Sequence, residues 1–171
     1  MLEDGSVYEG TARGDFKETA CEIVFNTSMT GYVEILTDPS YAGQGVVMTY
    51  PMIGNYGISR EDFESERLQP SAFIVHELSS DPSNFRCTDT IENLLKEYNI
   101  PCISGVDTRA VVKKLRESGT MRGVLTSDIS DRERLMDVIK SFRQIDLVGS
   151  VTAKQTKVYG EENTGAEIAL M

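Results

Sequence analysis

The sequence has few of the residues that build metal sites or disulfides, and no segment that suits a membrane. Its 171 residues contain no apolar run near the roughly 20 residues of a membrane helix, and the opening MLEDG cannot start a signal peptide. A single histidine accompanies three widely spaced cysteines, Cys21, Cys87 and Cys102, without a CxxC pair. The sequence therefore predicts buried free thiols, with no disulfide framework and no metal site, in a cytoplasmic protein.

Basic residues are outnumbered by acidic ones. The chain has 17 lysines and arginines against 27 aspartates and glutamates, which gives a formal net charge of -10 at pH 7. A surface of this charge repels phosphate backbones and anionic lipids, so neither nucleic acid nor a membrane is an expected partner. Apolar residues make up 40% of the chain, which is enough for one compact domain with a core.

The first half of the chain has the pattern of strands and turns, because short apolar runs end at glycine, proline or aspartate. Residues 31–36 predict one or two helical turns that end at Asp38, since a residue before proline disfavours the helical conformation. Gly43 and Gly45 predict a mobile surface loop, and no lysine or helix start follows them as a phosphate-binding loop requires. Strands are expected at residues 7–10, 22–26, 46–50 and 72–78.

The second half predicts three helices, each with a recognisable start. Strands at residues 102–104 and 123–126 alternate with them, so the whole chain is expected to form an α+β or layered β/β/α domain. The expected starts are Thr88 or Asp89, Asp107, and the capping box of Ser130 with Glu133, and the first two helices end at Pro101 and Gly119.

The carboxyl-terminal part changes composition. Residues 152–164 are polar with little apolar periodicity, which is typical of a linker. Residues 166–171 become apolar directly after Gly165 and have the pattern of a buried strand. We therefore expect a domain at residues 1–151, a linker at residues 152–164, and the start of a second, truncated domain at residues 165–171.

Several segments, in this order along the chain, match a single protein family. Ordered matches over residues 2–109 are very specific, whereas a lone DTR or YP would carry no information. The segments are residues 2–5 (LEDG), 24–32 (VFNTSMTGY), 34–41 (EILTDPSY), 49–57 (with TYP, IGN and Gly57), 83–86 (SNFR) and 105–109 (GVDTR). The sequence thereby resembles the amino-terminal domain of the small chain of glutamine-hydrolysing carbamoyl-phosphate synthetase.

The resemblance implies a role in a heterodimeric ligase. In that family the small subunit hydrolyses glutamine and passes ammonia to a large subunit that uses ATP and Mg. Bicarbonate, ammonia and ATP then give carbamoyl phosphate for pyrimidine and arginine biosynthesis. The amino-terminal domain mainly docks on the large subunit and supports the glutaminase domain. The expected partners are therefore the large subunit, the chain's own carboxyl-terminal glutaminase domain and, through that domain, L-glutamine.

The resemblance also implies a more specific fold. It predicts a three-layer β/β/α domain of the swivelling type that holds no cofactor of its own. Residues 165–171 (GAEIALM) resemble the first strand of the family's glutaminase domain, a class I amidotransferase.

We expect no catalytic residue in this chain. Glutamine hydrolysis of this class needs a thiolate on a strained strand-to-helix elbow, a histidine and a carboxylate, and none of the three cysteines has the small neighbours of an elbow. By the resemblance, Ser40 contacts glutamine when the glutaminase domain is present. From the residues alone, a turn serine that bonds its own backbone is the alternative. Ser40 cannot hold glutamine by itself.

Two further residues have alternative interpretations. His76 lies within the expected strand at residues 72–78, where a structural histidine is the expectation. The alternative function is a swivelling phosphohistidine carrier, which needs an exposed His76 near a helix amino terminus. Arg109 is hypothesised to form an ion pair across the subunit interface, although Asp107 as a helix cap already explains the DTR motif. A free-standing small-molecule binding domain finds no support in any constellation of polar residues.

Overall fold

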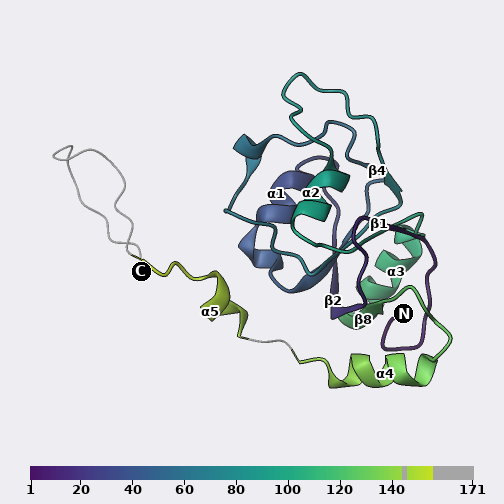
Figure 1. The fold of residues 1–171 in the computed structure, drawn as a ribbon. Helices are drawn as coiled ribbons and strands as arrows, with labels where there is room; N and C mark the ends of the chain where they lie inside the picture. The colour runs from purple at the N-terminus through teal and green to yellow at the C-terminus, as the bar shows by residue number, and fades with distance from the viewer. Residues whose placement is uncertain (144–145, 156–171) are drawn as a thin grey trace.

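The computed structural model describes residues 1–143 and 146–155, and these form a mixed α+β fold (Figure 1). Its main sheet has the strand order β1-β7-β5-β3-β2-β8. The four central strands pair in parallel, while β1 and β8 pair antiparallel at the two edges. The six strands are β1 (Thr11–Arg13), β2 (Thr19–Asn26), β3 (Gln44–Met48), β5 (Ala72–Ile74), β7 (Cys102–Ser104) and β8 (Met121–Leu125). A separate parallel pair consists of β4 (Met52–Ile53) and β6 (Glu77–Leu78).

Helices cover both faces of the main sheet. On one face α1 (Tyr32–Thr37) and α2 (Ile91–Glu97) pack on Val46 and Met48 of β3. On the other face α3 (Thr108–Ser118) packs around Val47. The alternation along β3 follows from the two-residue period of a strand. The remaining helices are α4 (Arg132–Ser141), which packs on β8, and the short α5 (Leu147–Val151), with single 3-10 turns η1 (Pro39–Tyr41) and η2 (Arg60–Asp62).

The α+β class is confirmed, but the expected β/β/α layering is not. In the described residues a second sheet is represented only by the β4–β6 pair, and α3 covers the face where a second sheet layer would lie. No helix in residues 1–143 and 146–155 has the length and apolar character needed to cross a membrane. Residues 152–155 form neither helix nor strand, while the rest of the expected linker and the strand expected at residues 166–171 lie outside the described residues.

Three predictions for the first half were wrong. Residues 7–10 form no strand and instead run along one face of the sheet, where Val7 and Tyr8 line a cavity. Gly45 is not in a mobile loop but is buried in β3, where only glycine fits, because a Cβ would lie 2.7 Å from Sγ of Cys21. The strand expected at residues 72–78 is split, since the chain leaves the main sheet after Ile74 and pairs with β4 only from Glu77.

The helix predictions were largely confirmed, with shifted caps. Asp107 caps α3 by accepting a hydrogen bond from the amide of Ala110 at 3.0 Å. However, α2 is capped by Thr90 instead of Thr88 or Asp89, and α4 is capped by Asp131 instead of Ser130. Several adjacent hydroxyl and carboxylate side chains can serve at each of these starts, so the exact cap depends on where packing places the helix.

Helix α4 is tied to the main sheet by an ion pair at the surface. The guanidinium of Arg134 donates hydrogen bonds of 2.7 and 2.8 Å to the two carboxylate oxygens of Glu18, which also accepts the Thr126 hydroxyl at 2.8 Å. The hydrogen bonds from Arg134 have the largest effect on Glu18, followed by the one from Thr126. Together they lower the pKa of Glu18 from its ordinary 4.5 to about 2. The ion pair therefore stabilises the fold above pH 4.5, and its contribution is lost as the pH falls through about 2.

Candidate functional site

Ser40 lies in η1, the single turn that follows α1. Its side chain is exposed, and its backbone amide donates a hydrogen bond of 2.8 Å to Oδ1 of Asp38. The carboxylate of Asp38 thus closes the turn, while the Ser40 hydroxyl makes no hydrogen bond within the described residues. The hydroxyl is therefore available to a group from outside this part of the chain.

The turn is anchored to the end of α1 by a buried threonine. The hydroxyl of Thr37 donates to the carbonyl of Val33 at 2.9 Å and accepts the amide of Glu64 at 2.9 Å. The carbonyl of Thr37 accepts the Ser65 hydroxyl at 2.5 Å. Because Thr37 is 0% exposed and fully hydrogen-bonded, the backbone immediately before Asp38 is held in one position.

A pair of tyrosines fixes the other end of α1. The hydroxyl of Tyr56 accepts the amides of Gly31 at 2.7 Å and Tyr32 at 3.1 Å, and so replaces the side-chain cap that Gly31 lacks. The Tyr32 and Tyr56 rings stack with centroids 4.2 Å apart, and the Tyr32 hydroxyl donates to the carbonyl of Gly57 at 2.7 Å. Burial raises the pKa of both phenols, so both stay neutral at physiological pH.

A hydrogen bond links the turn to the end of β2. Nδ2 of Asn26, at the end of β2, donates to the Tyr41 hydroxyl at 2.9 Å, and its Oδ1 accepts the amide of Ser28 at 2.7 Å. The loop that Asn26 thereby links to the turn carries Met29, which is 69% exposed. We call Ser40, Tyr41 and Asn26 the Ser40 surface. It offers hydroxyl and amide groups, which suit contact with another protein domain.

The cysteines of the chain are not members of the Ser40 surface. Cys21 and Cys102 are both 0% exposed, and burial raises the pKa of each to about 12. Cys87 is half-buried, and its thiol contacts the carbonyl of Asp89 at 3.3 Å. With pKa values of about 12, the thiols of Cys21 and Cys102 are not nucleophiles at neutral pH. Within the described residues, no group of three histidines, cysteines and carboxylates is placed to hold a metal.

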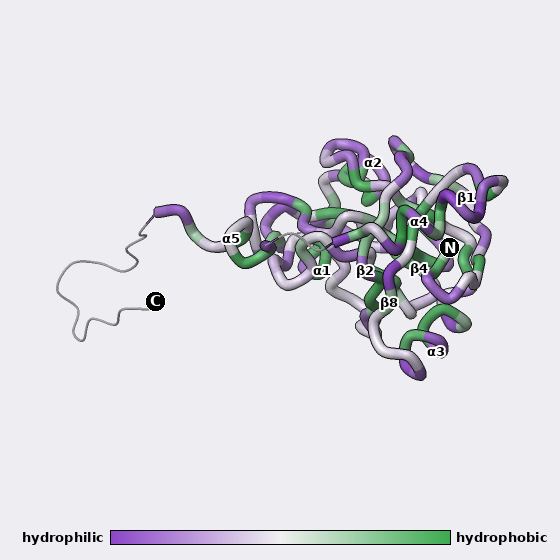
Figure 2. Tube along the Cα trace, turned by 90° about the horizontal axis from the view of Figure 1, so that it is seen from below, coloured by the Kyte–Doolittle hydropathy of each residue, from purple (hydrophilic) through white to green (hydrophobic). Residues whose placement is uncertain are grey.

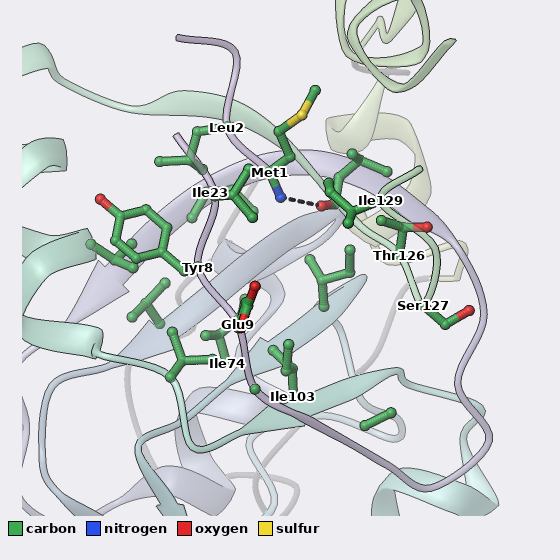
Figure 3. A pocket seen from close by; sticks show the side chains of 18 of the residues that line it. Met1, Leu2, Tyr8, Glu9, Ile23, Ile74, Ile103, Thr126, Ser127 and Ile129 are labelled. Atoms are coloured by element: carbon green, nitrogen blue, oxygen red, sulfur yellow. Dashed lines mark hydrogen bonds between the residues drawn. The ribbon is translucent and has the colours of Figure 1, made fainter. Parts of the chain in front are cut away.

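An apolar cavity of about 440 Å³ lies on the opposite face of the sheet (Figure 3). Ile23, Ile74 and Ile103 of the sheet line it, and residues 7–10 cross it. At its edge the Met1 ammonium donates to the carbonyl of Val124 at 2.9 Å, and burial lowers the pKa of this amine. The cavity belongs to the core that α3 covers, whereas the Ser40 turn follows α1. It is therefore not part of the Ser40 surface.

His76 is exposed and lies between β5 and β6, so the expectation that it lies inside an apolar strand was wrong. It follows the end of β5, and its Nδ1 lies 3.1 Å from the carbonyl of Val106, which fixes the ring. The helix start just after Val106 is capped by the carboxylate of Asp107. Since that negative charge would repel a phosphoryl group, the site does not suit a phosphohistidine.

The structure keeps Ser40 and Arg109 apart, because Ser40 follows α1 while Arg109 is exposed on α3, on the other face of the sheet. The Tyr32–Tyr56 pair was missed by sequence reasoning. Tyr32 ends the motif at residues 24–32, whereas Tyr56 lies between the matched residues Asn55 and Gly57 and is not itself one of them.

Comparisons with known proteins agree on one family. The family model described as carbamoyl-phosphate synthase small chain, CPSase domain, matches residues 1–125. The chain is 46% identical over 170 residues to a carbamoyl phosphate synthase small chain from Caldanaerobacter subterraneus subsp. tengcongensis, covering 99% of this chain and 45% of that protein. It is 47% identical over 175 residues to the carbamoyl phosphate synthase small chain from Archaeoglobus fulgidus, and this match covers 99% of this chain and 48% of that protein. The chain spans about half the length of the curated relatives it matches.

Proposed function

This chain belongs to the carbamoyl-phosphate synthase small-chain family, and we propose that it is the domain that docks the small chain on its large partner and supports the glutaminase domain. In this proposal the chain supplies no nucleophile, base or metal ligand. The thiols Cys21 and Cys102, with pKa values of about 12, support a non-catalytic role.

The observation that carries the proposal is the exposed hydroxyl of Ser40, which lies on a rigid turn and has no hydrogen bond within the described residues. Thr37 holds the end of α1 before the turn, and the Tyr32–Tyr56 pair holds its start. A hydroxyl fixed in this way can bond a ligand in an adjoining domain with little loss of conformational freedom. We propose that Ser40 contacts L-glutamine bound in the glutaminase domain, and that the rest of the Ser40 surface contacts that domain.

The reaction of the whole enzyme is part of the same proposal. The intact small chain hydrolyses glutamine, and the large chain uses ATP and Mg to convert bicarbonate and ammonia into carbamoyl phosphate for pyrimidine and arginine synthesis. We place the docking domain at residues 1–151 as a swivelling-type unit, the linker at residues 152–164 and the start of the glutaminase domain at residues 165–171. The enzyme is cytoplasmic in this proposal.

The chain alone provides the first test. We expect it to form a complex with the purified large chain in size-exclusion chromatography, and to show no glutamine binding in calorimetry, because Ser40 is the single glutamine contact that it offers. A separately produced glutaminase fragment should regain activity when this chain is added. Saturable glutamine binding by the chain at millimolar or lower concentration would contradict the proposal, as would failure of both association and reactivation.

Ser40→Ala in the complete enzyme tests the glutamine contact. A neutral hydrogen bond contributes about 0.5–1.5 kcal/mol, so we expect the glutamine KM to rise about two- to tenfold. The rate with ammonia in place of glutamine should not change, because ammonia does not require the glutaminase site. Ser80→Ala, at another exposed serine, is the matched control and should leave both rates unchanged. An unchanged glutamine KM in Ser40→Ala would remove Ser40 from the site.

A further inference from the structure

One face of α3 carries three exposed basic side chains, Arg109, Lys113 and Arg116. Their spacing of four and three residues places them on the same side of the helix, and we call them the basic face. With Thr49 and Val112 they line a shallow hollow of about 620 Å³.

Within residues 1–143 and 146–155, the basic face forms no ion pair with a carboxylate. None of its three members forms an ion pair with the described residues, whereas other basic residues such as Lys114, Arg122 and Arg134 do. What sets the basic face apart is that three exposed cations lie together on one side of a helix, in a chain with a net charge of -10. Glu117 also lines the hollow, but it forms no ion pair with any of the described residues.

The requirements of folding do not explain the basic face. Arg109 lies in the first turn of α3, where the helix dipole disfavours a cation, and Lys113 is a like-charged neighbour of both arginines. The helix is held by its opposite side, where Val111 and Leu115 are buried against the sheet, and by its cap at Asp107. Figure 2 shows the same division along α3, where green and purple segments alternate. The exposed charges are therefore available to a partner outside the described chain.

We propose that the basic face binds a carboxylate-rich surface of the large chain. This inference rests on the proposed docking function and names the surface that performs it. A chain of net charge -10 repels an acidic partner at most of its surface, so a local group of unpaired cations selects the point of approach. Two of the three cations are arginines, whose guanidinium groups pair with carboxylates through two hydrogen bonds.

The position of the basic face agrees with this role. Helix α3 covers the sheet face opposite to α1, which precedes the Ser40 turn (Figure 1). The two surfaces therefore do not overlap, and the domain can bind the large chain on one side while it contacts the glutaminase domain on the other.

The test uses the complete small chain and its large chain. Dissociation constants and association rates are measured by biolayer interferometry over a range of NaCl concentrations, for the unchanged protein and for the triple variant Arg109→Glu, Lys113→Glu and Arg116→Glu. We expect the variant to bind at least tenfold more weakly at low salt, mainly through slower association. We also expect added salt to weaken the unchanged complex and to have a smaller or opposite effect on the variant.

A second triple variant controls for total charge. Lys17→Glu, Arg132→Glu and Lys140→Glu change the net charge equally at exposed residues that form no ion pair within the described chain. This control should bind within about twofold of the unchanged protein, as expected for charges outside the contact. If the charge-reversal variant fails to fold, as judged by circular dichroism, the corresponding glutamine substitutions at the basic face replace it, with a smaller loss in the same direction.

The possible results separate the two proposals. No association of the unchanged small and large chains contradicts the docking function itself. Association that is equally strong, with the same salt dependence, in the basic-face variant overturns the inference about α3 and leaves docking intact. Equal weakening in the basic-face and control variants also overturns it, since total charge would then explain the effect.

Discussion

Tyr32→Ala is expected to lower the free energy of unfolding by about 3–5 kcal/mol, the usual range for removing a large buried aromatic ring. Tyr32 is 1% exposed, and it packs in the core between α1, α2 and the sheet. The substitution also removes the stack with Tyr56 and the hydrogen bond to the carbonyl of Gly57. Urea unfolding followed by circular dichroism measures the change.

Two conservative variants separate the parts of this effect. Tyr32→Phe keeps the ring and leaves the buried carbonyl of Gly57 without its partner, which is expected to cost about 1–3 kcal/mol. Tyr56→Phe removes the acceptor of two amides at the start of α1 and is expected to cost about 1 kcal/mol. A loss below about 1 kcal/mol in Tyr32→Ala would show that the ring is not needed to hold α1.

Local signals were sufficient to predict α1 to α4, whereas the short α5 was not predicted. Asp107 and Gly119 bracket α3, and the Asp38–Pro39 pair ends α1 at Thr37, because caps and prolines act through bonds and clashes within a few residues. The same argument explains the errors of one or two residues at α2 and α4. Thr90 and Asp131 each have neighbours of equal capping ability, so the sequence allows several starts.

Contacts between distant segments could not be predicted from local patterns. The apolar residues 72–78 have the pattern of one strand, but the amide of Gly105 bonds the carbonyl of His76, and the chain then pairs with β4. Gly45 suggested a loop because glycine is common in loops, whereas its reason here is the side chain of Cys21 on the adjacent strand. Both features depend on which strands become neighbours.

The candidate site was predicted only through the family resemblance. Nothing in the residues around Ser40 identifies its hydroxyl as unused, because that depends on Asp38 closing the turn and Thr37 anchoring the helix. Likewise the distance of 24 positions between Tyr32 and Tyr56 hides their pairing. Arg109, in contrast, could be singled out from its motif, and the structure adds Lys113 and Arg116 beside it.

Gly57→Ala is expected to lower the free energy of unfolding by about 3 kcal/mol or more, for two separable reasons. Gly57 has a φ of 70°, a conformation that costs an L-residue about 1–2 kcal/mol. A Cβ would also lie 2.2 Å from Sγ of Cys87 and 3.0 Å from the carbonyl oxygen of Asp89. Gly5→Ala is the matched control, since Gly5 has a φ of 84° with nothing within 4 Å of a built Cβ, and it should show the backbone cost alone.

The double variant Gly57→Ala with Cys87→Ala tests the steric part of this cost. Removing Sγ relieves the closest contact, so the double variant should be more stable than Gly57→Ala by about 1 kcal/mol, although Cβ of Cys87 still lies 3.0 Å away. Equal losses in Gly57→Ala and Gly5→Ala would contradict the steric argument. Because the carbonyl of Gly57 accepts the Tyr32 hydroxyl, a shift of this backbone also reaches α1. In the complete enzyme, Gly57→Ala should therefore raise the glutamine KM without any contact between Gly57 and glutamine.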